Sequence, residues 1–250
     1  MSIDVARDGA VAVVTVDRQD ALNALNVETL TELRDRLRDL STDNDVRVVV
    51  LTGAGEKAFV AGADIKYMSG LGSDEAKGWG GLGHEAGRLL ETMAKPTIAA
   101  INGFALGGGC ELALACDIRY ASSRAKLGQP EINLGIVPGW GGTQRIARVC
   151  GVGVAKDLIM TGRLVDAEEA LRIGLVSAIA DPVLDKALQT AHELTAKSSL
   201  ALALAKRLIN MSPGALDTEA DEFGELFSSA DAIEGLTAFA EKRAPKFVGR

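Results

Sequence analysis

The sequence has few of the residues that build metal sites and disulfide frameworks. Its 250 residues include three cysteines, two histidines, two tryptophans and two tyrosines. The odd number of cysteines (Cys110, Cys116 and Cys150) predicts reduced thiols in an intracellular protein. The sequence has no Cys-x-x-Cys pair and no cluster of Cys and His, so it predicts no metal site.

Long hydrophobic runs and an excess of basic charge are also missing. No stretch approaches the roughly 18 continuous apolar residues of a membrane-spanning helix, and MSIDVARDGA at the start lacks the basic flank of a signal or transit peptide. The 27 basic side chains are outnumbered by 34 acidic ones, which gives a net charge of −7. Because phosphate backbones bind basic surfaces, this acidic balance predicts no nucleic-acid partner. Since no membrane span or targeting segment is apparent either, we expect a cytoplasmic protein without a membrane partner.

Two common nucleotide and nucleophile motifs are absent as well. There is no G-x-x-x-x-G-K-[ST] phosphate loop and no G-x-S-x-G elbow. The run Gly78–Gly83 satisfies G-x-G-x-x-G, but no predicted strand precedes it, so it predicts no dinucleotide site. Residues 69–83 are rich in glycine and show no clear periodicity, and we expect a mobile or variable segment there.

What the chain does have is glycine, 28 residues of it, placed after short apolar runs. Strands are expected at 10–17, 46–52 and 97–102, and an amphipathic helix at 27–40. VVVLTG and TIAAING each lead into a glycine-containing turn and a helix, which favours an α/β core of stacked strand–turn–helix units. We divide the chain into this core, residues 1–183, and a region at 184–250 that we expect to serve association. Helices are expected there at 184–210, 214–229 and 231–243.

The sharpest candidate site is the run NGFALGGGCE, residues 102–111. Three successive glycines at a helix start leave backbone N–H groups accessible, and the helix dipole adds partial positive charge, so an anion or a developing oxyanion fits there. Glu111 projects near the same point. The alternative is that the glycines serve close helix packing and that Glu111 is an ordinary acid of the first turn.

Two further features gain meaning only beside this one. AGADIK, residues 61–66, is a second glycine turn after a strand and supplies a second candidate backbone donor, although a plain turn is an equally simple explanation. Glu131 follows Pro130 among apolar neighbours, which indicates partial burial, and a buried carboxyl group has a raised pKa. The alternative is an ordinary salt-bridged or solvated acid. Cys110 is interpreted as a small packing residue rather than a nucleophile, because no histidine partner is identifiable.

In combination these runs resemble the enoyl-CoA hydratase/isomerase (crotonase) superfamily, and in particular its hydratases with two glutamates. The matching runs are ALNALN (21–26), KAFVAGADIKYM (57–68), PTIAAINGFALGGGCELALACDIRYA (96–121), LGQPEINLGIVPGWGGTQR (127–145), AEEALRIGLVSAI (167–179) and FAEKRAPKF (239–247). The resemblance implies an α/β fold, a crotonase-like spiral of ββα units with a helical C-terminal region that builds trimers or hexamers.

The resemblance also implies roles for single residues. The backbone N–H groups of Ala63 and Gly108 are expected to bind the carbonyl oxygen of an acyl-CoA thioester as an oxyanion hole. Glu111 is expected to activate the water that attacks C3, and Glu131 to deliver a proton to C2. Gly139 lies where relatives orient that water with a backbone N–H. No metal or separate cofactor is implied, since CoA is part of the substrate.

The CoA moiety is expected to lie along a stretch whose members are Asp64, Ile65 and Lys66. Asp20 stands where many relatives carry a basic residue near the CoA phosphates, and Arg18 or Lys57 is the expected replacement. The predicted reaction is reversible syn hydration of trans-2-enoyl-CoA to 3-hydroxyacyl-CoA, as in fatty-acid β-oxidation. The alternatives are an enoyl-CoA isomerase, other enolate chemistry on CoA thioesters, or a non-catalytic member that binds acyl-CoA or RNA.

Overall fold

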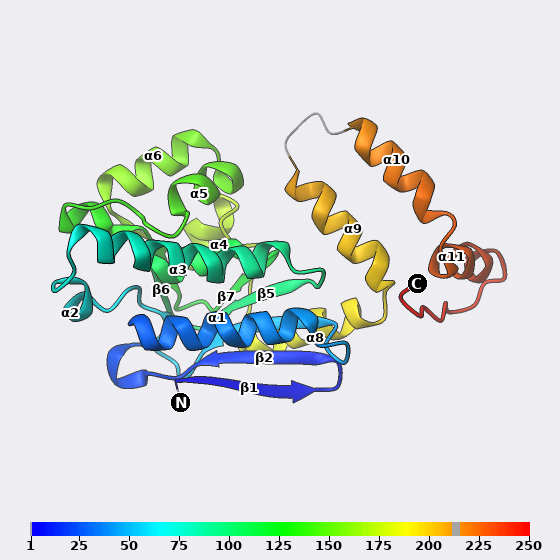
Figure 1. Ribbon diagram of the computed structural model, residues 1–250, viewed down its shortest axis with the longest axis horizontal. Helices are drawn as coiled ribbons and strands as arrows, with labels where there is room; N and C mark the ends of the chain where they lie inside the picture. The colour runs from blue at the N-terminus through cyan, green and yellow to red at the C-terminus, as the bar shows by residue number, and fades with distance from the viewer. Residues whose placement is uncertain (1, 212–215) are drawn as a thin grey trace.

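Two β-sheets form the centre of the protein (Figure 1). The computed structural model describes residues 2–211 and 216–250. In order across the larger sheet lie β1 (Ile3–Asp8), β2 (Val11–Val16), β3 (Val48–Gly53), β5 (Thr97–Ile101), β7 (Ile118–Ala121) and β10 (Ala178–Ile179). In order across the smaller sheet lie β4 (Ala58–Val60), β6 (Phe104–Leu106), β8 (Lys126–Gly128) and β9 (Leu164–Asp166).

The larger sheet is parallel except for its first hairpin. β1 and β2 pair antiparallel, whereas β2, β3, β5, β7 and β10 pair parallel in that order. Every residue of β3 and of β5 is buried, as expected for parallel strands covered on both faces. The strands predicted from apolar runs at 10–17, 46–52 and 97–102 are therefore confirmed.

Helices cover both faces of this sheet because side chains alternate along its strands. On one face Val14, Leu51 and Ile101 join the core under α1 (Val27–Thr42) and α3 (Ser73–Thr92). On the other face Val50 and Ile98 pack against α8 (Val183–Thr195). The predicted division of the chain between 183 and 184 falls at the first residues of α8.

The repeated strand–turn–helix units are visible in the connections. β3 in the larger sheet leads to β4 in the smaller sheet and then to α2 (Ile65–Met68) and α3. In the same way β5 leads to β6 and α4 (Gly108–Ala115). The remaining helices of this part are η1 (Gln19–Ala21), η2 (Pro130–Leu134), α5 (Gly142–Cys150), α6 (Val152–Thr161) and α7 (Ala167–Arg172).

Residues 73–83 of the segment that was expected to be mobile or variable are helical. Residues 73–92 form the single helix α3, and the run Gly78–Gly83 lies inside it. Glycine is a poor helix former, which obscured the periodicity. Its use here is close packing at Gly83, where an added Cβ would lie 2.2 Å from the ring of Trp140.

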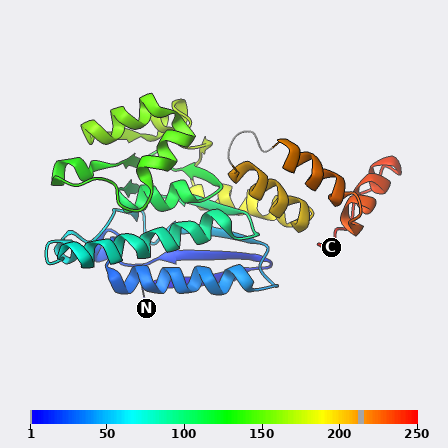
Figure 2. The ribbon, with the colours of Figure 1, turned by 45° about the horizontal axis from the view of Figure 1, so that its top comes forward.

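The C-terminal helices lie to one side of the sheets (Figures 1 and 2). The chain beyond 184, expected to begin with one long helix to 210, is broken after α8, and Ser198 caps the start of α9 (Ser199–Asn210). Next come α10 (Leu216–Leu226) and α11 (Ala230–Ala240). The predicted helix at 214–229 begins with two residues that lie outside the described ones.

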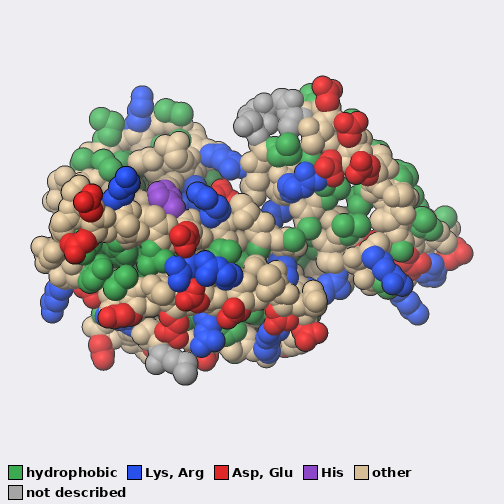
Figure 3. Space-filling model, viewed as in Figure 1, with side chains coloured by type: hydrophobic (Ala, Val, Ile, Leu, Met, Phe, Trp, Pro, Cys, Tyr) green, Lys and Arg blue, Asp and Glu red, His purple; other side chains and the backbone are tan. Residues whose placement is uncertain are grey.

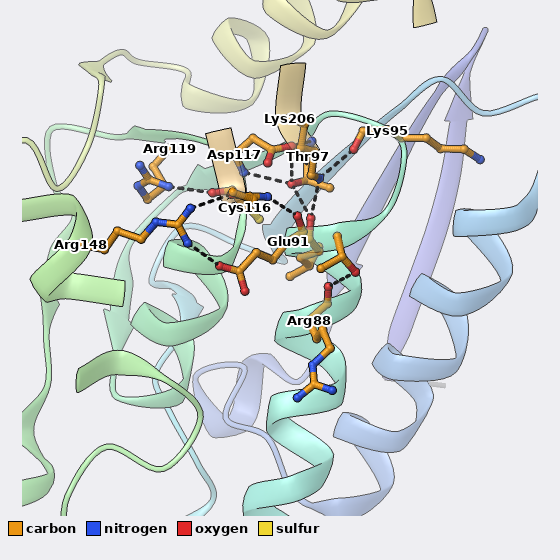
Figure 4. Close-up of polar contacts among 12 residues, drawn as sticks. Arg88, Glu91, Lys95, Thr97, Cys116, Asp117, Arg119, Arg148 and Lys206 are labelled. Atoms are coloured by element: carbon orange, nitrogen blue, oxygen red, sulfur yellow. Dashed lines mark hydrogen bonds and ion pairs between the residues drawn. The ribbon is translucent and has the colours of Figure 1, made fainter. Parts of the chain in front are cut away.

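A partly buried ion pair holds α9 against the sheet (Figure 4). The ammonium group of Lys206 lies 2.8 Å from the Asp117 carboxylate and also donates to the carbonyl oxygens of Leu90 and Lys95, at 2.8 and 2.9 Å. Asp117 in turn accepts from the backbone N–H of Thr97 at 2.8 Å. Because all these partners lie at the starts of β5 and β7 or at the end of α3, the pair fixes where α9 leaves the body.

The surface drawn in Figure 3 mixes acidic and basic side chains over the same face. This mixing agrees with a chain whose 34 acidic residues slightly outnumber its 27 basic ones. Within the described ranges, no helix combines the length and apolar character needed to cross a membrane.

Candidate active site

The glycine triplet forms the beginning of α4. Gly107 has a positive φ of 50°, and Gly108 is the first helical residue. A Cβ at Gly109 would lie 1.9 Å from the carbonyl oxygen of Val60, and one at Gly108 would lie 2.2 Å from the ring of Trp140. The glycines are therefore required for close packing. Packing does not consume the Gly108 N–H, because the first N–H groups of a helix have no intrahelical acceptor.

Glu111 lies in the first turn of the same helix and is buried. The residue is only 2% exposed to solvent. One carboxylate oxygen, Oε1, accepts hydrogen bonds from the N–H groups of Trp140 at 2.8 Å and Gly142 at 2.7 Å. Burial raises the pKa of Glu111, while these two donors and the charge of Arg145 oppose the rise. The carboxyl group is thus fixed in position by backbone donors.

Glu131 approaches the same helix start from η2. A Cβ at Gly107 would lie 2.8 Å from Glu131 Oε1, so only a glycine leaves room for this carboxyl group. Burial, together with the negative charge of Glu111, raises the pKa of Glu131 to about 7. The structure therefore brings the two glutamates, 20 residues apart in the sequence, to one end of α4.

The second glycine turn lies beside the first. Gly62 has a φ of 106°, and a Cβ there would lie 3.0 Å from the carbonyl oxygen of Leu106, the residue before the glycine triplet. Ala63 pairs with Leu25 in an isolated bridge, which is held by hydrogen bonds on either side of it. The two predicted donor turns are thus adjacent, although they are separated by more than forty residues in the sequence.

The stretch predicted to line CoA forms the start of α2. The Asp64 carboxylate caps this helix by accepting from the N–H of Lys66 at 3.1 Å, and it lies 3.4 Å from the guanidinium of Arg18. Ile65 is 59% exposed and Lys66 is also exposed. Asp64 therefore already has local partners, whereas Ile65 and Lys66 are exposed to solvent. Gly139 is exposed and directly precedes Trp140, one of the Glu111 donors.

Three other potentially reactive side chains have packing or surface roles. Burial raises the pKa of Cys110 to about 12, so its thiol stays protonated, in agreement with a packing role. His192 bonds Asp8 at 3.0 Å near the surface, and burial lowers the pKa of His84 in α3. No group of three potential metal ligands occurs among the residues that the structure describes.

Two kinds of residue around the glutamates were not predicted from the sequence. Gln129, which is fully buried, donates to both Glu131 oxygens at 2.9 and 3.1 Å when its amide nitrogen faces them. Trp79 stacks edge-on against Trp140 and against Tyr67. The scarcity of tryptophan was visible in the sequence, but no spacing connects positions 79 and 140, because their contact forms only when α3 packs over the start of α5.

Comparison with known proteins identifies the arrangement. A family model described as enoyl-CoA hydratase/isomerase matches residues 6–250. The chain belongs to the enoyl-CoA hydratase/isomerase family. Among the curated members of this family, a short-chain-enoyl-CoA hydratase of Clostridium acetobutylicum is 49% identical over 95% of this chain and 94% of that protein. A crotonyl-CoA hydratase of Syntrophomonas wolfei is 45% identical over 100% of this chain and 98% of that protein.

Solved structures of the enoyl-CoA hydratase/isomerase family share the fold. The crystal structure of an enoyl-CoA hydratase from Bacillus anthracis superimposes with a TM-score of 0.95 at 39% identity and covers all of both chains. The α/β fold predicted from the family resemblance, with its parallel sheets and helical C-terminal region, is therefore confirmed.

Proposed function

We propose that the protein is an enoyl-CoA hydratase that adds water reversibly to trans-2-enoyl-CoA and forms 3-hydroxyacyl-CoA. One observation carries the proposal: two carboxyl groups with raised pKa values, the buried Glu111 and the partly buried Glu131, lie at the glycine-rich start of α4. Family membership and hydratase relatives at 45–49% identity support the same reaction.

The proposed oxyanion hole consists of the N–H groups of Ala63 and Gly108. Attack of water on C3 of an enoyl thioester moves negative charge onto the carbonyl oxygen. Fixed backbone donors stabilise that charge without reorganisation, and each is worth roughly 3–4 kcal/mol in comparable enzymes. The adjacency of the two turns, through the contact of Gly62 with Leu106, supports this pairing.

The proton transfers are assigned to the two glutamates. In hydration, Glu111 accepts a proton from the water as its oxygen bonds to C3, and Glu131 gives its proton to C2. The pKa of Glu131, about 7, keeps a substantial fraction protonated near neutral pH. Both groups act from the same end of α4, which accounts for syn addition. We assign orientation of the water to the N–H of Gly139.

The substrate and cofactor assignments follow from this chemistry. Asp64, Ile65 and Lys66 are proposed to line the CoA moiety, and the Arg18 guanidinium beside Asp64 is the nearest candidate for its phosphates. Hydration changes no overall oxidation state, and the glutamates move the protons, so the reaction requires no metal or redox cofactor. Full activity after exhaustive dialysis against EDTA is the expected result. A cytoplasmic location stays a prediction.

Association through the C-terminal helices is proposed from their exposed apolar side chains. Those more than half exposed on α10 and α11 include Leu216, Phe223, Ile233, Leu236 and Phe239. Burying them between copies is favourable, and we propose a homotrimer or homohexamer. Light scattering should show dissociation in Phe239→Glu, but not in Met160→Glu, whose exposed position lies on α6. A monomeric wild-type protein contradicts the proposal.

The function is tested with crotonyl-CoA, by following the loss of absorbance of the conjugated thioester. Turnover with incorporation of oxygen from labelled water supports hydration. Conversion of a 3-enoyl-CoA without such incorporation supports an isomerase instead. Tight acyl-CoA binding without turnover of any short or medium enoyl-CoA rejects catalysis.

A further inference from the structure

Trp140 fills the space between two helices next to the proposed reaction centre. Its residue is 5% exposed. A Cβ at Gly83 of α3 and a Cβ at Gly108 of α4 would each lie 2.2 Å from its ring. The indole is therefore seated directly against the backbone of both helices. It cannot swing aside without moving one of them, because protein interiors leave little free space around a side chain.

Trp79 extends this surface toward α2. Its ring centroid lies 5.3 Å from that of Trp140, with an interplanar angle of 87°. On its other side the centroid of Tyr67 lies 5.2 Å away, at 75°. Trp79 is 7% exposed, and partly buried Met68, Leu71 and Leu82 pack against the same core. The three rings form a continuous aromatic wall from α2, across α3, to the start of α5.

This aromatic wall lies directly behind the groups assigned to chemistry. The backbone N–H of Trp140 bonds Glu111, and its ring packs on Gly108, the proposed oxyanion donor. Tyr67 follows closely after Ala63, the other proposed donor, and its backbone N–H donates to the Asp64 carboxylate at 3.4 Å. The aromatic wall therefore bounds the proposed site on the side of Gly108 and Glu111.

We propose that Trp79 and Trp140 close the acyl end of the site and restrict the enzyme to short-chain enoyl thioesters of the crotonyl type. This inference rests on the proposed function and adds its specificity-determining residues. The rigid seating of Trp140 between Gly83 and Gly108 is what makes the limit strict. A longer chain would have to displace an indole that is packed against two helix backbones.

The kinetic test compares kcat/KM for crotonyl-, hexenoyl-, octenoyl- and decenoyl-CoA. In the wild type, kcat/KM should fall at least about tenfold from crotonyl- to octenoyl-CoA, since single methylenes are discriminated by about 10–200-fold in tight apolar pockets. Trp140→Ala and Trp79→Leu should each reduce that ratio by about tenfold. Leu37→Ala, which empties buried space in α1 away from the aromatic wall, should lower stability and leave the ratio unchanged.

A binding test separates this inference from the proposed reaction. Trp79 and Trp140 are the only tryptophans of the chain, so tryptophan emission, excited selectively over that of tyrosine, reports on the aromatic wall alone. Saturated butyryl- and octanoyl-CoA cannot be hydrated, so their binding is independent of turnover. Butyryl-CoA should perturb the emission and bind at least about tenfold more tightly than octanoyl-CoA, and Trp140→Phe should narrow the difference.

The outcomes are distinct. Equal kcat/KM for crotonyl- and octenoyl-CoA in the wild type overturns the inference while leaving hydration intact. So does an unchanged chain-length ratio in both Trp140→Ala and Trp79→Leu when their circular dichroism is native. No turnover of any chain length, together with selective binding of butyryl-CoA, overturns the proposed function and keeps the short-chain limit. If Trp140→Ala fails to fold, Trp79→Leu and the wild-type series still decide.

Discussion

The helix that carries Glu111 and the turn that carries Glu131 place the same functional group in different surroundings. Glu111 is 2% exposed, and Oε1 receives two backbone donors at 2.7 and 2.8 Å. Glu131 lies on a short 3-10 turn and is only partly buried, yet burial and the charge of Glu111 raise its pKa to about 7. Burial raises both pKa values. At Glu111 two N–H donors and the charge of Arg145 oppose the rise. At Glu131 a single backbone hydrogen bond opposes it, and the charge of Glu111 adds to it.

The two carboxyl groups are therefore suited to different tasks. Donors that stabilise the ionised form favour a fixed base at Glu111, and their position in a helix leaves that group little freedom. A pKa near 7 favours a proton donor at Glu131. Because the charges interact, the proton belongs to the pair, and the observed titrations are properties of both groups together.

Removing either ionisable group should have the largest effect. Glu111→Gln and Glu131→Gln should each lower kcat for crotonyl-CoA hydration by about a hundredfold to ten-thousandfold, the usual range for a lost general acid or base. The change is measured under saturating substrate. Glu85→Gln, on the exposed side of α3, should keep wild-type kcat. Full activity in either site variant breaks the assigned roles.

The fit between the two regions is tested at Gly107. Gly107→Ala forces an alanine to adopt a φ of 50° and places a Cβ 2.8 Å from Glu131 Oε1. A displacement of about 1 Å at a catalytic group costs about a hundredfold in rate, so kcat should fall by that order. Gly9→Ala has a similar φ of 58° with nothing near its Cβ. It should cost about 1–2 kcal/mol of stability at most and leave kcat unchanged.

The pH dependence sharpens the comparison further. Both directions of the reaction need one proton on the glutamate pair, and hydration takes up no net proton. The kcat/KM values for hydration and dehydration should therefore fall together as pH rises above about 7, where Glu131 loses its proton. The limiting slope is about tenfold per pH unit. Profiles that are flat up to about pH 9, or that differ between the two directions, contradict the assignment.

The smallest expected effect is on stability. The pKa of Glu131 is raised from an ordinary value of 4.5 to about 7, so the folded protein binds this proton more tightly than the unfolded chain. The stability that the folded protein gains from binding this proton is therefore present at low pH. It is lost as pH rises from about 4.5 to about 7. The free energy of unfolding of the wild type should fall, relative to that of Glu131→Gln, by roughly 1–3 kcal/mol across this range. Urea titrations of both proteins near pH 5 and near pH 8 measure this difference. If the free energies of unfolding of the two proteins change in parallel with pH, the prediction is refuted.

Sequence patterns predicted the strands better than the glycine-rich helix. Fully buried parallel strands leave unbroken apolar runs, such as the one in β3, that need no knowledge of their neighbours. The first half of α3, residues 73–83, was missed because it is rich in glycine, and one of these glycines, Gly83, accommodates the ring of Trp140, far along the chain. Local propensity carries no record of such a contact.

The candidate site was likewise predicted only in part from the sequence. Glu111 and Glu131 were nominated by their places in glycine- and proline-containing runs, together with the family resemblance. Gln129 was not, since nothing in its spacing shows that its amide faces the Glu131 carboxylate. The roles of Ala63 and Gly108 remain proposals that the adjacent turns make testable.

The sequence by itself determined which segments are apolar enough to be buried, where glycine permits a turn, and which acids stand beside those turns. Only the tertiary structure decided how the two acids differ. The donors that hold Glu111 come from Trp140 and Gly142, 29 and 31 residues away, and the carboxyl group facing Gly107 comes from η2. Desolvation and hydrogen bonding depend on what surrounds a group in space, so the difference between the surroundings of the two carboxyl groups arises only when the chain folds.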